Sequence, residues 1–355
     1  MAHDTVYACV RDKAESIGQL PVRLKRKTGD TYEKVTQGRE FRIFTQRPND
    51  FQTMQDFIEM YVATLELRGN FYAYVSRNKY GNVAEILPFR NQAGVSVNMD
   101  ASGRVYYMYA TNDGKPDMTF AGADILHVKN FTLDGFTGAS AIAYGARSIG
   151  IGIAQEDYLS NIMADGFLAK GVLTTEQAFK GVEGLNRLKS DWKKFTGTNA
   201  QSEIPILEQG LKYQALNISP ADAELISQRG FSREQICGIL RVPPRRIGIT
   251  ASAKGAGSDI EQENKDYYQN KLVPIITKLE HAINFVLPDN LSISLDEKGF
   301  IRGDFESQVK GAHEAVKSGL ASLNEGREII DMQPVDGGDV HAIDTNNLTF
   351  GVLTD

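Results

Sequence analysis

The stretch FSREQICGILRVPPRRIG, residues 231–248, joins a helical pattern to a stiff, basic turn. Its first half continues a helix that we expect over residues 220–240. Pro243 and Pro244 follow, and proline lacks the backbone donor that a helix requires. The stretch therefore predicts a helix that passes into a turn, with Arg245 and Arg246 directly after the two prolines.

Five arginines lie between residues 229 and 246, and Glu234 is the only acid among them. Arg229 and Arg233 are four residues apart, so they share one face of a helix. Two interpretations stay open for this basic segment. It is a solvated face with salt bridges at an interface, or it contacts phosphate groups in a sequence-independent, salt-sensitive way, with Arg245 and Arg246 as the candidate contacts.

The loop that follows, GITASAKGAGS at 248–258, invites comparison with a phosphate-binding loop but lacks the required order. Lys254 precedes Gly255, and Ser258 follows Gly257 with no lysine between them, whereas a P-loop needs Gly-Lys-Ser/Thr. Three acids at 259–263 would also repel a phosphate. Because its small residues bury little surface, we expect a mobile loop rather than a nucleotide site.

Upstream, residues 138–166 have the apolar spacing of one long helix, yet glycines lie at positions 138, 145, 150 and 152. Each interior glycine costs up to about 1 kcal/mol of helix propensity. Such glycines usually allow another backbone to approach closely. Gly145, Gly150 and Gly152 are therefore candidates for tight packing, either between copies of this chain or inside a single subunit.

The remaining segments predict a mixed α+β fold. Toward the N-terminus we expect a helix ending before Pro21, a strand that turns at residues 29–30, a helix at 50–67 capped by Asn49 or Asp50, and an antiparallel meander over 70–130. Further along we expect an amphipathic helix from Thr174, a strand pair over 203–217 hinged at 209–210, a helix at 259–286 kinked at Pro274, a strand near 291–300, and helices after 304 with a capping box at Ser322 and Glu325.

Composition limits the functional class. The 355 residues suggest two or three domains or one multi-part subunit, and 39 basic against 45 acidic residues argue against a broad nucleic-acid-binding surface. That balance still permits brief contact with nucleic acid or its enclosure. Cys9 and Cys237 are interpreted as two reduced core cysteines, which fits a reducing compartment. We expect no signal peptide and no membrane span.

The sequence predicts no catalytic residue, metal site or cofactor. Its five histidines form no pair at ligand spacing, and GxSxG, HExxH and CxxC motifs are absent. His127 stands between Leu126 and Val128 in a predicted strand, where a hydrogen-bonded structural role is favoured over metal ligation.

Taken in order, several stretches resemble the portal (head–tail connector) proteins of tailed bacteriophages of the long-noncontractile-tail type. They are VYACVRDKAESIGQLPVRL, GNFYAYVSRN with EILPF, ILHVKNFTLDGFTGASAI, FSREQICGILRVPPRRIG followed by LVPIITKLEHAIN, and GLASLNEGREIIDMQPVDGGD. The resemblance covers nearly the whole chain, and its strength lies in the ordered set rather than in one motif.

This resemblance implies a ring, typically dodecameric, at one capsid vertex, with double-stranded DNA passing through its channel. It assigns 1–137 and 259–303 to the wing, 138–167 and 220–246 to the stem, 168–219 to the clip and 304–355 to the crown. Residues 247–258 would be the tunnel loop, which would place Ser252, Lys254, Gly255, Gly257 and Ser258 near DNA. The glycines of 138–166 would pack between neighbouring stems.

The implied partners are other copies of the chain, DNA, the terminase motor, the major capsid protein and a head–tail adaptor, with no membrane. The implied location is the virion, after assembly in the host cytoplasm. Two alternatives remain: a nucleotide-dependent enzyme that uses the 248–258 loop, and an oligomeric scaffold that does not touch DNA.

Overall fold

The computed structural model describes residues 3–29, 31–111, 116–164, 171–174, 186, 212–215, 233–249, 257–296, 305–330 and 332–341. The main helices are α1 (Asp4–Gly18), α2 (Arg39–Phe41), α3 (Met54–Arg68), α4 (Ala141–Ala164), α7 (Gly257–Tyr267), α8 (Val273–Val286), α9 (Phe305–Lys317) and α10 (Leu323–Ile329). The strands are β1 (Val22–Thr28), β2 (Thr31–Val35), β3 (Asn70–Arg77), β4 (Val83–Pro88), β5 (Val95–Met99), β6 (Val105–Tyr109), β7 (Met118–Ala121), β8 (Ile125–Lys129), β9 (Gly171–Thr174), β10 (Lys212–Ala215) and β11 (Leu291–Leu295). This mixture is the predicted α+β class.

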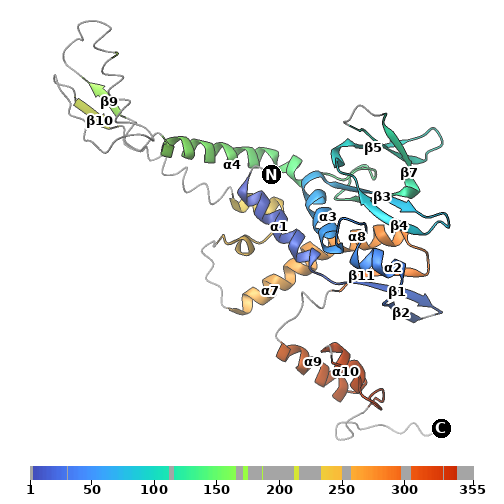
Figure 1. Cartoon of the computed structure of the whole chain (residues 1–355). Helices are drawn as coiled ribbons and strands as arrows, with labels where there is room; N and C mark the ends of the chain where they lie inside the picture. The colour runs from blue at the N-terminus through green and yellow to red at the C-terminus, as the bar shows by residue number, and fades with distance from the viewer. Residues whose placement is uncertain are drawn as a thin grey trace. The chain divides into compact units, whose positions relative to one another are not determined.

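The chain divides into two compact units, one of residues 1–19 with 23–294 and one of residues 20–22 with 295–355. In the first unit, α1 packs along α3, and α3 contacts β3 (Figure 1). A buried ion pair joins the two helices, with Lys13 Nζ 2.8 Å from Glu66 Oε1. In the second unit, α9 packs on α10.

The predicted meander at 70–130 is two antiparallel sheets, ordered β4-β3-β8 and β5-β6-β7. They share an aromatic core in which Tyr72, Phe89, Tyr107 and Ile125 are buried. The prediction of one sheet was wrong because β8 returns to pair with β3 instead of continuing beside β7. Only the second sheet is a meander in chain order.

Two helix boundaries differ from the prediction for local reasons. α3 begins at Met54 because Thr53 and Asp56 form a capping box, while the Asn49 side chain accepts from the backbone of the preceding turn. The predicted kink at Pro274 is a π-helical segment, η5 (Tyr268–Leu272), directly before α8. Pro274 lies in the first turn of α8, directly after the π-helical segment. The backbone N–H that proline lacks is therefore missing at a point where the regular α-helical hydrogen bonds are already interrupted.

The predicted strand pair at 203–217 also differs. β10 pairs antiparallel with β9, so the partner of residues 212–215 lies at 171–174. The first half of the predicted pair lies outside the described residues. Of the helix predicted from Thr174, Thr174 is the last residue of β9 and residue 186 is helical, and the rest lies outside the described residues. The strand at 291–295 and the capping box of Ser322 with Glu325 at the start of α10 are confirmed.

Candidate functional site

α4 uses one face to pack within its own subunit. A Cβ placed on Gly145 would lie 3.1 Å from the Ile239 side chain, and one placed on Gly152 would lie 2.7 Å from His3 Nε2. Contacts this close leave little or no room for a side chain. Gly145 and Gly152 therefore serve contacts inside the subunit, which the sequence left open as one of two alternatives.

The opposite face of α4 is open. A Cβ on Gly150 would meet no atom within 4 Å, and Ala143, Arg147 and Ala154 on the same stripe are also exposed. Tyr144 and Ile151, seven residues apart, are 74% and 50% exposed. Large apolar side chains beside small ones form the kind of surface that another helix covers. Of the three predicted packing glycines, only Gly150 remains a candidate for contact between subunits.

A hydrogen-bonded cluster fixes the start of α4 to the sheet. Asn70 Nδ2 donates to Gly138 O at 2.8 Å, and Asn70 Oδ1 accepts from Gly138 N at 2.7 Å. His127 bridges this Asn70 oxygen at 3.0 Å and the Tyr107 hydroxyl at 3.1 Å. Burial, reinforced by the charge of Lys129, lowers the pKa of His127 to about 3. The structural role predicted for His127 is confirmed.

The helical segment 233–239 ends sooner than the predicted stem helix 220–246. Arg241 adopts a left-handed φ of 56°, Arg241 N donates to Gly238 O, and Val242 N donates to Cys237 O. This pattern is a Schellman cap, in which a left-handed residue terminates the helix. Pro243 then prevents its resumption, and a short 3-10 turn, η4 (Pro244–Ile247), follows.

Arg246 is held by a network within the subunit. Its Nη2 lies 2.9 Å from Asp12 Oδ1, its Nε donates to Asp12 Oδ2 at 3.0 Å, and its guanidinium carbon lies 4.7 Å from the ring centroid of Tyr267. The Tyr267 hydroxyl donates to Asp12 at 2.9 Å. Burial disfavours the charged guanidinium, but the hydrogen bonds and charge of Asp12 outweigh it and raise the pKa of Arg246. No sequence pattern marks Asp12, 234 positions away, as this partner.

The same turn braces the two ends of the segment 250–256. Arg245 Nη1 lies 3.6 Å from Glu263 Oε2, and Arg246 Nη1 donates to Asn264 Oδ1 at 3.2 Å. Both acceptors belong to α7, which follows the segment. The two arginines predicted as candidate phosphate contacts thus have partners inside the subunit.

The residues predicted to lie near DNA divide between two regions. Ser252, Lys254 and Gly255 lie outside the described residues. Gly257 and Ser258 are the first residues of α7, so the helix begins two residues earlier than predicted.

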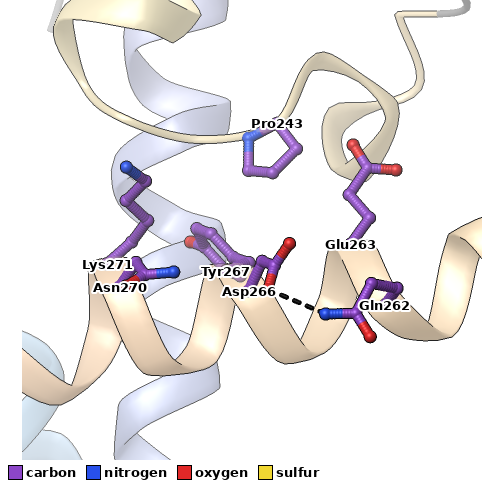
Figure 2. A pocket seen from close by; sticks show the side chains of 7 residues that line it. All are labelled: Pro243, Gln262, Glu263, Asp266, Tyr267, Asn270 and Lys271. Atoms are coloured by element: carbon purple, nitrogen blue, oxygen red, sulfur yellow. Dashed lines mark hydrogen bonds between the residues drawn. The ribbon is translucent and has the colours of Figure 1, made fainter.

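A shallow pocket of about 380 Å³ lies between Pro243 and α7 (Figure 2). Glu263, Asp266 and Lys271 give its wall both signs of charge. Asp266 accepts from Gln262 at 3.0 Å, and Tyr267 is engaged with Asp12. Glu263 pairs with Arg245, so the two acids and the tyrosine of this wall are already engaged within the subunit.

His3, Asp4 and Glu156 place ligand-type atoms within 4.8 Å of one another, a grouping that the sequence spacing did not indicate. Asp4 Oδ2 pairs with Arg233 at 3.0 Å, and His3 Nδ1 accepts from Thr5 N at 3.2 Å. The Arg233 guanidinium thus already neutralises the Asp4 carboxylate, the charge that a metal ion would otherwise balance. This ion pair joins α1 to the segment 233–239. Among the described residues, no helix is long and apolar enough to cross a bilayer.

Helix caps, ion pairs and close glycine contacts account for the polar groups gathered around α4 and the turn at 241–248. Together with the open face of α4, they define an α+β subunit in which one face of a long helix is not covered by its own chain. The comparisons with known proteins identify its family.

The chain belongs to the phage portal protein family, which matches residues 4–331. It is 30% identical to the portal protein of Enterobacteria phage HK97 over 346 residues, covering 95% of this chain and 80% of that protein. A chain in the neck of an empty GTA particle computed with C6 symmetry superimposes with a TM-score of 0.70 at 19% identity, covering 94% and 91% of the two chains. A chain in the neck of a native GTA particle computed with C12 symmetry superimposes with a TM-score of 0.65 at 20% identity, covering 94% of this chain and 91% of that chain.

Proposed function

We propose that this portal protein forms a closed ring, dodecameric in the assembled particle, at one vertex of a capsid and that the ring encloses double-stranded DNA. The role is structural rather than enzymatic. The observation that carries the proposal is the open face of α4, where Tyr144, Gly150 and Ile151 face away from their own subunit.

Ring closure requires two different, complementary faces on every subunit. The open face of α4 supplies a surface for one of them, with Tyr144 and Ile151 as its large apolar side chains and Arg147 as an exposed charge. Related folds occur in particle necks computed with C6 and C12 symmetry, which supports a cyclic arrangement of this chain.

Of the tunnel loop predicted at 247–258, Lys254 and the other residues between η4 and α7 form the DNA-proximal part of the proposed ring. The segments on either side of residues 250–256 are joined by the pairs Arg245–Glu263 and Arg246–Asn264. A subunit with net charge −6 and few cations at the constriction limits DNA affinity, because every phosphate contact adds affinity through counterion release. Weak contact suits a channel through which DNA must slide.

The proposal extends to the other partners. Residues 168–219 would dock the terminase motor and the head–tail adaptor, and the sheets of 1–137 with residues 259–303 would face the major capsid protein. These assignments follow the order of the family resemblance.

Ring formation is tested by electron microscopy and mass photometry of the purified chain across protein concentration and salt. We expect annular particles with one cyclic symmetry. A chain that remains monomeric under every condition would contradict the proposal.

DNA contact is tested in assembled particles with Lys254→Glu, and Lys317→Glu serves as a control with the same charge change at an exposed position near the end of α9. We expect both variants to assemble and only Lys254→Glu to alter the salt dependence of DNA packaging. Equal behaviour of the two variants would remove Lys254 from the DNA path and leave ring formation unaffected.

A further inference from the structure

The fold brings the only two cysteines of the chain together. Cys9 lies on α1 and Cys237 on the helical segment 233–239, and their sulfur atoms are 4.0 Å apart. Both residues are fully buried and both thiols are free. The sequence separates them by 228 residues and predicts only two reduced core cysteines.

The surroundings make the two thiols unequal. The Cys9 thiol donates to Cys237 Sγ, and this hydrogen bond together with burial raises the pKa of Cys9. The same hydrogen bond, with a contribution from the charge of Arg233, lowers the pKa of Cys237. Since the thiolate is the reactive form, Cys237 is the nucleophile of the pair and Cys9 is the resolving thiol.

We propose that Cys9 and Cys237 are an oxidation site that forms a reversible intramolecular disulfide with a peroxide. The Cys237 sulfur attacks one peroxide oxygen, the O–O bond breaks, and a sulfenic acid forms as hydroxide leaves. Cys9 sulfur then attacks Cys237 sulfur, the S–O bond breaks, and the hydroxyl group leaves as water. Overall, two thiols and one hydrogen peroxide give one disulfide and two waters.

The disulfide would covalently join α1 to the helical segment 233–239, the two parts of the subunit against which α4 packs at Gly152. Arg233 already ties the segment to α1 through Asp4 at 3.0 Å, and Ile236 and His3 form the surface on which Gly152 rests. Bond formation needs the sulfurs to approach from 4.0 Å to about 2 Å, a shift within the reach of side-chain rotation and small helix movement. This inference concerns one subunit and is independent of ring formation.

The test treats the native, reduced chain with hydrogen peroxide and follows thiols and mass. We expect free thiols to fall from two to none per chain in one phase, with a mass loss of about 2 Da. Proteolysis of the blocked product should yield a linked peptide pair containing Cys9 and Cys237. Under denaturing, non-reducing conditions the chain should migrate faster, and dithiothreitol should reverse every change.

Cys9→Ser and Cys237→Ser are matched controls that should give neither the linked peptides nor the mobility shift. The wild-type peptide map decides the question even if a serine at either buried position prevents folding. Three outcomes would overturn the proposal: retention of both thiols in the native chain under conditions that oxidise the urea-unfolded chain, conversion of one thiol to sulfinic acid without a cross-link, or disulfides only between chains.

Discussion

The ion pair with Asp12 gives Arg246 a structural role, which the position of Arg246 in a basic stretch of sequence does not indicate. The carboxylate receives the guanidinium and the Tyr267 hydroxyl together, so three chain segments meet at one residue. Arg245, the preceding residue, has a single longer contact with Glu263 and is more exposed. Two adjacent arginines of the same motif thus differ in how much of the fold depends on them.

We predict that Arg246→Gln lowers the free energy of unfolding by about 2 kcal/mol, since it leaves Asp12 largely buried without its ion-pair partner. Arg245→Gln should cost less than about 0.5 kcal/mol, as expected for a half-exposed pair. Urea unfolding of both variants measures the contrast, and Asp12→Asn completes a double-mutant cycle with Arg246→Gln. Equal losses at the two arginines would refute the distinction.

His127 makes stability depend on pH. Its pKa is about 3 in the folded chain and near 6.5 in the unfolded chain, so only the unfolded chain gains this proton between those values. The stability from the neutral ring is therefore complete above about pH 6.5 and decreases as pH falls toward 3, by about 2 kcal/mol between pH 7 and pH 5.

The variant His127→Gln keeps one donor and one acceptor but has no titratable ring. We expect it to be less stable at pH 7 and to lose this component of the pH dependence. Urea midpoints of both chains at pH 5 and pH 7 provide the measurement. Parallel curves for the two chains would mean that His127 does not carry the effect.

At the scale of elements, the two faces of α4 have different roles: one packs inside the subunit, and the other is the proposed contact with a neighbouring subunit. Gly150→Leu should leave the subunit as stable as before or slightly more stable, because a Cβ at this position meets no atom within 4 Å and leucine favours the helix over glycine by about 1 kcal/mol. The same bulk should obstruct a neighbouring helix, so rings should be lost. Thermal unfolding and mass photometry report the two effects separately.

Gly152→Ala is the matched change on the other face. Its Cβ would press on His3, which caps α1, and we expect a loss of about 1–2 kcal/mol. If Gly150→Leu assembles at the same concentration as the unaltered chain, the open face of α4 is not the subunit contact.

The sequence could predict that α4 is a helix and that its glycines permit close packing, because both follow from local spacing. It could not predict which glycine faces inward, since that depends on His3 and Ile239 at distant positions. The same limit applies to Asp12 with Arg246 and to Cys9 with Cys237. The two-sheet arrangement depends on β8 pairing back to β3, and strand pairing of that kind carries no local signal.

For the whole molecule, the division into two compact units has a consequence for folding. The first unit contains α1, α3, α4, α7, α8 and both three-stranded sheets of the region 70–129. The second has a small core of its own, where Gly326 of α10 meets Val316 of α9 and Ala312 and Ala321 are buried. Separate cores usually allow separate unfolding.

We predict that a chain ending at residue 303, which lacks α9 and α10, retains the fold of the first unit and still forms rings. The open face of α4, the brace of Arg246 on Asp12 and the anchor at Asn70 all lie within the first unit. Its urea midpoint, followed by circular dichroism, should match the main transition of the full chain. A truncated chain that cannot fold would show that residues 304–355 stabilise the first unit, whereas a folded chain without rings would place the subunit contact in α9 and α10.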